Sequence, residues 1–252
     1  MSDAPVALIT FASGYVGPEL APLLAASGHR LVLETPSAGA ADTAALAARL
    51  GADGTDVEVV TGVDLRTAAG NQELVARALA RFGRLDAACL LTGEIVVGRF
   101  LRVSEDRWER VKAANLDMVF HGLQAVLPPM VERKYGNVVV FTSATGARPD
   151  PGVSIYSGTR AGANAMIRAV ALEHAADDVV LNAVGTNYMD FPGFLEATGA
   201  TDPERRKVIE AQVPLHRLGT MRELAEFTAV LLDGRSRFQT GQFFSFSGGW
   251  SP

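Results

Sequence analysis

The sequence predicts a single doubly wound α/β domain, in which a parallel sheet of seven strands is flanked by helices. Short apolar runs alternate with longer amphipathic stretches from one end of the 252 residues to the other. This alternation is typical of repeated βαβ units, which build a parallel sheet. With 48% hydrophobic residues the chain can bury a substantial core. No internal repeat or shift in composition marks a second domain, so residues 1–252 are expected to form one.

The strands are expected at the short apolar runs. The segment Val138–Phe141 is continuously apolar, as a parallel strand buried on both faces should be. The seven predicted strands are Val6–Thr10, Arg30–Glu34, Val57–Val60, Asp86–Leu91, Asn137–Phe141, Val179–Val184 and Gln242–Phe246.

Six amphipathic stretches between these runs are expected to form the main helices. Ser104 is expected to cap the N-terminus of one helix, and Gly28, Gly51 and Gly83 are expected to end others. The predicted helices are Val16–Ala26, Asp42–Leu50, Asn71–Phe82, Glu105–Arg133, Ile155–Ala175 and Met221–Leu232.

The charge balance argues against nucleic acid or an anionic membrane as a partner. The formal net charge is -5 and the isoelectric point is near 5.4, whereas both kinds of partner require clustered positive charge. The short basic run Arg205–Lys207 is read as a solvated helix face. The chain has a single cysteine, Cys89, which we expect to be buried, and neither an internal disulfide nor a metal site is predicted.

The N-terminal residues lack the basic region and hydrophobic core of a signal peptide. No uninterrupted apolar run approaches the roughly 20 residues that span a bilayer. A cytoplasmic protein is therefore expected.

The loop after the first strand is where an α/β fold of this kind places a glycine-rich turn for a dinucleotide. Such turns use glycine because a side chain would occupy the volume through which the pyrophosphate approaches the backbone. Here the turn contains Phe11 and Tyr15, whose rings are expected to fill this volume, so no cofactor is predicted. In an alternative reading, Gly14 serves in a shifted register and Tyr15 points outward, which leaves a poor nucleotide site.

The fifth strand and the helix after it carry the candidate catalytic residues. Tyr156 and Arg160 are four residues apart, which puts both side chains on one helix face, one turn apart. Ser143, at the end of the neighbouring strand, can face the same pocket. Arginine stays protonated, so we expect Arg160 to favour the phenolate form of Tyr156. The alternative is a stacked surface pair without a chemical role.

These residues resemble the catalytic arrangement of the short-chain dehydrogenase/reductase superfamily, which has a Rossmann-like fold, except that Arg160 replaces the usual lysine. On that superfamily's pattern Thr-Gly-x3-Gly-x-Gly, the first two glycines become Phe11 and Tyr15. The changed glycine turn and the arginine at position 160 together make the chain resemble the halohydrin dehalogenase branch, over essentially its whole length. The pattern of that branch is Thr-x4-Phe/Tyr-x-Gly followed by Ser-x12-Tyr-x3-Arg.

The resemblance implies a carbon–halide lyase that converts vicinal halohydrins to epoxides and halide without a cofactor. The reverse reaction would open epoxides with azide, cyanide or nitrite. In this reading the Tyr156 phenolate removes the hydroxyl proton, Ser143 hydrogen-bonds the same oxygen and Arg160 keeps the tyrosine ionised.

The resemblance also implies where halide and substrate lie. The halide site is expected at Thr186, Asn187, Tyr188 and Met189, closed by the ring of Tyr15. The substrate pocket is expected to include Phe11, Thr145, Phe191 and Phe194. Alternatively, Tyr188, Phe191 and Phe194 are ordinary packing of a lid over the core.

Two other functions remain open at this point. The first is a divergent NAD(P)-dependent short-chain dehydrogenase/reductase, favoured by Asp64-Leu65 and by Asn115, which we read as inherited scaffold contacts. The segment Leu91–Glu94 stands against it, because the superfamily has Asn-Asn-Ala-Gly there. The second is a catalytically silent scaffold protein, which would be expected to lose one of the three catalytic residues.

A homotetramer is expected from the resemblance and from small residues along the catalytic helix, which allow close packing on a neighbouring subunit. Trp250 is a candidate for reaching that neighbour. The small residues are Ser157, Gly158, Ala161, Gly162, Ala163 and Ala165.

Overall fold

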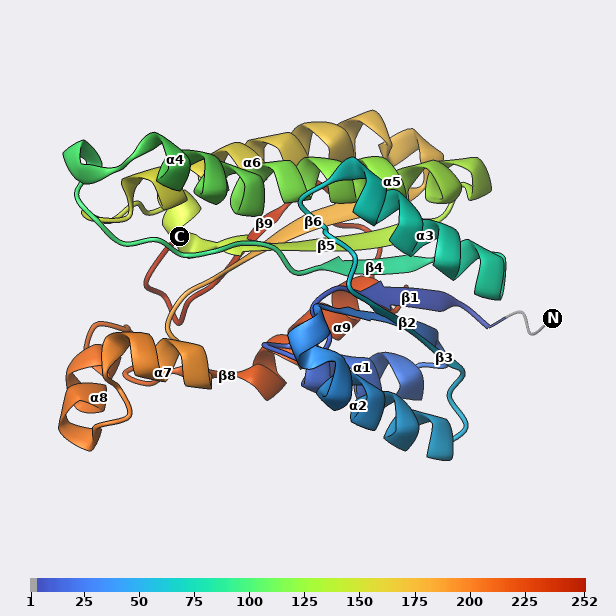
Figure 1. Ribbon diagram of the computed structural model, residues 1–252, viewed down its shortest axis with the longest axis horizontal. Helices are drawn as coiled ribbons and strands as arrows, with labels where there is room; N and C mark the ends of the chain where they lie inside the picture. Colours follow the sequence, from blue (N-terminus) through green and yellow to red (C-terminus); the bar gives the residue numbers. More distant parts are fainter. Residues whose placement is uncertain (1–3) are drawn as a thin grey trace.

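The computed structural model describes residues 4–252, which form a single α/β domain around a seven-stranded parallel sheet (Figure 1). The strand order is β3-β2-β1-β4-β5-β6-β9, and each neighbouring pair is parallel. This order confirms the predicted doubly wound, Rossmann-like topology. The strands are β1 (Val6–Ile9), β2 (Arg30–Thr35), β3 (Val57–Thr61), β4 (Ala87–Leu90), β5 (Gly136–Ser143), β6 (Val179–Thr186) and β9 (Phe243–Phe246).

Two helical layers cover the sheet, one on each face (Figure 1). The upper layer contains α3 (Ala68–Phe82), α4 (Glu105–Lys112), α5 (Met118–Arg133) and α6 (Ser154–Glu173). The lower layer contains α1 (Gly17–Ala26), α2 (Ala40–Ala52) and α9 (Met221–Leu232). Each layer buries an apolar stripe against the sheet, which gives one hydrophobic cluster on each face.

The long helix predicted over Glu105–Arg133 is interrupted. A π-helical turn, Ala113–Asp117, separates α4 from α5. Such turns are frequent at functional sites because they redirect side chains within a continuous helix. Asn115 lies in this turn and is completely buried, so the interruption directs a polar side chain into the protein.

A small subdomain projects beyond the sheet at the end where the parallel strands finish (Figure 1). It consists of α7 (Pro192–Thr198), α8 (Pro203–Glu210) and the short parallel pair β7 (Met189–Asp190) and β8 (Gly219–Thr220). None of these four elements is among the predicted ones. They are too short to show a clear hydrophobic period. Four single turns of 3-10 helix complete the described part of the chain: Ser37–Gly39, Phe100–Arg102, Ala144–Gly146 and Ala175–Asp177.

The predicted helix ends are mostly confirmed. The Ser104 hydroxyl accepts a hydrogen bond from the Arg107 N–H at 3.3 Å, and Gly83 ends α3 with a φ of 73°. Gly28, with a φ of 87°, follows the end of α1. The prediction for Gly51 is wrong, because this residue lies inside α2 and the turn that follows uses Gly54 instead.

Cys89 is fully buried on β4, as expected, and burial raises the pKa of its thiol. Within residues 4–252, no group of three or more His, Cys, Asp or Glu side chains could hold a metal ion. The same residues include no helix that is both long and apolar enough to cross a membrane. The basic run lies on α8, where Arg206 pairs with Asp190 and Glu210 at the surface.

Candidate active site

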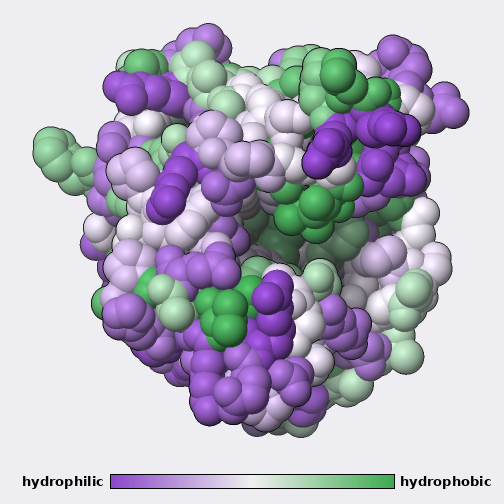
Figure 2. Space-filling view, turned by 90° about the vertical axis from the view of Figure 1, so that its left-hand side faces the viewer, coloured by the Kyte–Doolittle hydropathy of each residue, from purple (hydrophilic) through white to green (hydrophobic). Residues whose placement is uncertain are grey.

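A cavity of about 560 Å³ opens at the carboxyl ends of the central strands. Figure 2 looks onto this end of the molecule and shows a hollow with apolar walls. The walls come from the loops after β1, β4, β5 and β6, and from α6 and α7, as expected for a ligand site of an open α/β sheet. The structure brings all twelve predicted site residues to this cavity: Phe11, Tyr15, Ser143, Thr145, Tyr156, Arg160, Thr186, Asn187, Tyr188, Met189, Phe191 and Phe194.

Tyr156 and Arg160 share the inner face of α6. They are 8% and 3% exposed, and the Arg160 Cζ lies 5.4 Å from the centre of the Tyr156 ring. A stacked pair on the protein surface is therefore wrong, since both side chains are buried. The cation lies beside the phenol at the cavity wall, and the burial of both side chains strengthens the interaction between charges there.

Ser143 lies at the last position of β5, with its side chain at the cavity wall. Its Oγ lies 2.9 Å from the Thr145 Oγ1 and accepts a hydrogen bond from the Thr145 N–H at 3.2 Å. The Oγ also donates to the Thr186 carbonyl at 3.4 Å, so donation to a ligand oxygen requires the exchange of this long bond, because a hydroxyl has one donor position.

The Arg160 guanidinium is held by uncharged groups. Its Nη1 donates to the Thr92 Oγ1 at 2.8 Å and to the Phe141 carbonyl at 3.4 Å, and its Nη2 donates to the Thr92 carbonyl. No carboxylate within the described part of the chain forms an ion pair with it. The buried positive charge is therefore not neutralised by the protein, and it acts on whatever occupies the cavity.

The turn after β1 keeps the backbone shape of a glycine-rich turn but not its open volume. Phe11 and Tyr15 have φ values of 49° and 50°, in the left-handed region that glycine favours. The Tyr15 hydroxyl crosses to the end of β6 and donates to the Thr186 Oγ1 at 2.7 Å. Its ring packs edge-on against Phe141 and Phe191, with centroid distances of 5.9 and 4.9 Å.

Tyr15 therefore points into the cavity, and the outward orientation is wrong. Burial raises the pKa of its phenol, which keeps Tyr15 protonated as a hydrogen-bond donor to Thr186. The pyrophosphate of a dinucleotide must pass close to the backbone of this turn. The residues present do not fit a dinucleotide in that position, because an aromatic ring occupies its path.

Glu34 strengthens this closure from the second strand. Its carboxyl group is 1% exposed and accepts a hydrogen bond from the Phe11 N–H at 3.0 Å. Burial raises the pKa of Glu34 to about 7. The side chain thus satisfies a backbone donor of the turn.

The segment after β6 has little free hydrogen-bonding capacity for an anion. The Asn187 N–H donates to the Phe246 carbonyl at 3.4 Å, and the Tyr188 N–H donates to the Asn187 Oδ1 at 3.0 Å. Met189 is 2% exposed and packs in the core. These two N–H groups, which were expected to help hold a halide, are already used inside the protein.

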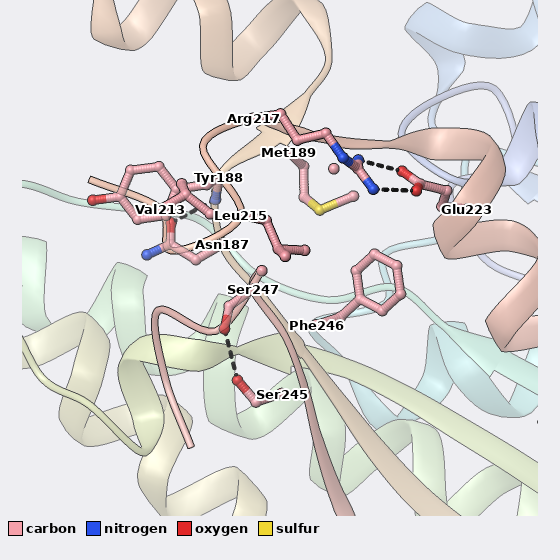
Figure 3. A pocket seen from close by; sticks show the side chains of 12 residues that line it. Asn187, Tyr188, Met189, Val213, Leu215, Arg217, Glu223, Ser245, Phe246 and Ser247 are labelled. Carbon is pink, nitrogen blue, oxygen red and sulfur yellow. Dashed lines mark hydrogen bonds and ion pairs between the residues drawn. The ribbon is translucent and has the colours of Figure 1, made fainter. Parts of the chain in front are cut away.

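A second cavity of about 240 Å³ lies beside the same segment, and Figure 3 shows its lining. Asn187, Tyr188 and Met189 line both cavities. Arg217 is paired with Glu223 at 2.6 Å, and the Ser245 and Ser247 hydroxyls lie 2.9 Å apart. The charge of Arg217 is therefore compensated, in contrast to that of Arg160.

Trp250 packs on its own chain. It is 5% exposed, its ring centre is 5.7 Å from that of Tyr188, and the Arg148 guanidinium lies 4.6 Å above it. The expectation that Trp250 reaches a neighbouring subunit is not supported, since its ring is buried within the chain. On α6, Gly158, Ala161, Gly162 and Ala165 are exposed, whereas Ser157 and Ala163 are buried against the domain.

Several cavity residues were missed by the sequence reasoning. In the sequence, Thr92 and Gly93 are recognisable only as a departure from the Asn-Asn-Ala-Gly segment of the superfamily. A Pro at the start of α7 and Gly199 at its end, with a φ of 72°, are a helix signal that could have been read. The other missed residues are Gly14, Leu91, Ile95, Val97, Phe141, Thr142, Gly193, Ala197 and Thr198.

Asp64 and Asn115, which favour the NAD(P)-dependent alternative, both contact other residues of the protein. The Asp64 carboxylate, at the surface, pairs with Arg66 at 2.8 Å. The Asn115 Nδ2 donates to the Glu94 and Val111 carbonyls, both at 2.9 Å. Both side chains thus contact the surrounding protein, while the buried Asn115 Oδ1 has no hydrogen-bond partner in the described residues.

Comparison with known proteins identifies the family of the chain. A family model described as Enoyl-(Acyl carrier protein) reductase matches residues 13–251. A protein of Staphylococcus epidermidis named 3-oxoacyl-[acyl-carrier-protein] reductase FabG is 29% identical over 248 residues, covering 96% of this chain and 97% of that protein. The Escherichia coli protein of the same name is 27% identical over 249 residues, covering 98% and 97%. An acetoacetyl-CoA reductase of Acinetobacter is 28% identical over 249 residues, covering 99% and 98%.

These comparisons contradict the predicted activity. The relatives are named as reductases, so the prediction of a halohydrin dehalogenase, a lyase that forms epoxides, is corrected in favour of the oxidoreductase alternative. The wider resemblance is confirmed, because the matches extend over nearly the whole chain. The chain belongs to the short-chain dehydrogenase/reductase superfamily, within the family described as Enoyl-(Acyl carrier protein) reductase.

Proposed function

We propose that this protein is a divergent short-chain dehydrogenase/reductase in which Tyr156 exchanges a proton with the oxygen of a small alcohol or carbonyl substrate. The observation that carries the proposal is the grouping of Ser143, Tyr156 and Arg160 in one cavity, beside a buried cation without a carboxylate partner. A phenol and a fixed cation that are both buried suit acid–base catalysis at oxygen.

In this proposal each of the three residues has a separate task. Ser143 donates a hydrogen bond to the substrate oxygen, which orients it. Tyr156 gives a proton to that oxygen or takes one from it. The charge of Arg160 stabilises the phenolate that remains after Tyr156 has donated, because it is not neutralised elsewhere in the cavity.

The cavity wall also supports a substrate of limited polarity. Apart from Arg160, the lining contains no charged side chain, and much of it is aromatic or aliphatic. Arg160 lies beside Tyr156, and a charged group anywhere else along this wall would have no partner, which is costly. We therefore propose uncharged substrates with an apolar body and one hydroxyl or carbonyl oxygen.

The names of the relatives favour reduction of a carbonyl as the overall reaction. Reduction requires a hydride donor, and in nicotinamide-dependent members of the superfamily a dinucleotide supplies it. Phe11 and Tyr15 stand in its usual place, so the residues of this chain explain the proton transfer and not the hydride transfer.

A substrate-consumption assay tests the proposal. A panel of small ketones and secondary alcohols is incubated with the protein, with and without NADH, NADPH or their oxidised forms, and the loss of each compound is followed by gas chromatography. We expect wild type to consume at least one compound of the panel. A dinucleotide requirement would support the reductive direction. Failure to consume any compound would contradict the proposed substrate class.

A further inference from the structure

The loop after β4 is built around the Arg160 side chain. Thr92 accepts from the guanidinium twice, through its hydroxyl at 2.8 Å from Nη1 and through its carbonyl. The Thr92 hydroxyl in turn donates to the Phe141 carbonyl at 2.9 Å, on β5. Thr92 therefore ties the guanidinium to two strands of the sheet, and its position follows from the sheet itself.

Gly93 leaves the space that the guanidinium occupies. A Cβ atom added to Gly93 would lie 1.6 Å from the Arg160 Nη2 and 2.5 Å from its Cζ. A side chain at position 93 would force the Arg160 guanidinium to move, and the φ of Gly93, 113°, is itself one that residues other than glycine rarely adopt. The guanidinium can therefore occupy its observed position only while residue 93 is glycine.

The π-helical turn supports the same loop from the other side. The Asn115 Nδ2 donates to the carbonyl of Glu94, directly after Gly93, at 2.9 Å. The Asn115 Oδ1 would lie 2.7 Å from a Cβ on Gly93, so this amide also closes the space around the glycine. The loop is thus fixed between the sheet and the helix that carries Asn115.

From these contacts we propose that Thr92 and Gly93 are positioning residues, which hold the Arg160 guanidinium beside Tyr156. The inference rests on the proposed function, in which the charge of Arg160 stabilises the ionised Tyr156. Arg160 has a long and flexible side chain, and its guanidinium makes no ion pair in the described residues. The loop therefore holds the guanidinium group, and with it the positive charge, in one position.

Stability measurements test the Gly93 contact without any assay of activity. We expect Gly93→Ala to lower the midpoint of thermal unfolding more than Gly28→Ala does. Gly28 also has a positive φ, 87°, but nothing lies within 4 Å of its added Cβ, so that variant reports backbone strain alone. In an Arg160→Ala background the contact with the guanidinium is gone and only the 2.7 Å contact with the Asn115 Oδ1 remains, so we expect the excess loss to shrink. If Gly93→Ala lowers the thermal midpoint by the same additional amount in the Arg160→Ala background, the proposed contact is wrong.

Kinetics test the positioning role. With the panel compound that wild type consumes fastest, we expect Thr92→Val to lower kcat roughly 10- to 100-fold while KM changes little. Thr92→Ser should restore most of the rate, because it keeps the hydroxyl. Thr43→Val is the matched control: the Thr43 hydroxyl is buried, within the described residues it has no hydrogen-bond partner, and it lies on α2 away from the cavity.

The two experiments separate this inference from the proposed function. Coupling between Gly93 and Arg160 in stability, together with full activity of Tyr156→Phe, would reject the proposed function and leave the contact standing. Loss of activity in Tyr156→Phe, together with unchanged kcat in Thr92→Val and Gly93→Ala, would overturn the positioning role and leave the proposed function standing.

Discussion

At the scale of single residues, the arginine at position 160 distinguishes this cavity. Three hydrogen bonds to Thr92 and Phe141 use both terminal nitrogens of the guanidinium, a geometry that the single nitrogen of lysine cannot reproduce. Burying a charge without a carboxylate is costly, and such arrangements concentrate at functional sites. The residue type at position 160 and its surroundings therefore support the role proposed for Arg160.

The Tyr15 ring occupies the volume through which the pyrophosphate of a dinucleotide would approach the turn. We expect Tyr15→Gly to bind NADPH at least about tenfold more tightly than wild type, because glycine suits the φ of 50° and frees the path of the pyrophosphate. A fluorescence titration of NADPH measures this. Tyr15→Phe is the control, since it keeps the ring and loses only the bond to Thr186. Equal affinities in all three proteins would show that the ring is no barrier.

The raised pKa of the buried Glu34 is expected to make the stability of the protein depend on pH. Burial raises its folded-state pKa from 4.5 to about 7, so the folded protein prefers the protonated form. Stability is then lost as the pH rises through the window from 4.5 to about 7. At 1.36 kcal/mol per pKa unit, the full difference corresponds to about 3 kcal/mol.

Chemical denaturation across this pH window measures the effect. We expect the free energy of unfolding of wild type, relative to that of Glu34→Gln, to fall with rising pH, because glutamine cannot ionise. The expectation fails if the difference between the two proteins is the same at every pH.

At the scale of elements, α9 is fixed by a capping box. The Thr220 hydroxyl accepts from the Glu223 N–H at 3.1 Å, and the Glu223 carboxylate accepts from the Thr220 N–H at 3.0 Å. Arg217 also binds this carboxylate, and these contacts lower the pKa of Glu223 to about 2. The cap matters beyond its own helix, because β8 ends at Thr220 and pairs with β7 beside the cavity.

We expect Thr220→Ala to lower the free energy of unfolding by about 1 kcal/mol, because the first turn of α9 loses its side-chain acceptor. Thr220→Ser keeps the oxygen and should retain most of the stability. Equilibrium unfolding in urea compares the three proteins. A value for Thr220→Ala within error of wild type would show that Arg217 and Glu223 hold the turn without the threonine.

Long, strongly periodic elements were predictable from the sequence, and short ones were not. All seven main strands occur where apolar runs predicted them. For the five central strands the reason is burial on both faces, which leaves a continuous signal, whereas β3 and β9 are only partly buried. The pair β7 and β8 depends on the tertiary contact of Met189 with Gly219, which no local pattern contains, and α7 is marked only by the Pro at its start and Gly199 at its end. The π-helical turn at Asn115 was likewise invisible, since its residues continue a helical period.

At the scale of the whole molecule, the topology explains why the site could be assembled from distant motifs. The loops after β1, β4, β5 and β6 are separated in sequence and meet at one edge of the sheet. The twelve residues of the predicted site could be found for this reason. Their chemistry was less predictable: the turn at Phe11 and Tyr15 indicates a closed nucleotide path, whereas the relatives are named as reductases.

The rate at which Tyr156→Phe consumes the preferred panel compound tests the central proposal most directly. Tyr135→Phe is the control, because the Tyr135 hydroxyl contacts Asn137 at the other end of β5, away from the cavity. We expect Tyr135→Phe to match wild type and Tyr156→Phe to be at least about 100-fold slower, with an unchanged thermal midpoint. A Tyr156→Phe protein that works at the wild-type rate would contradict proton exchange by Tyr156.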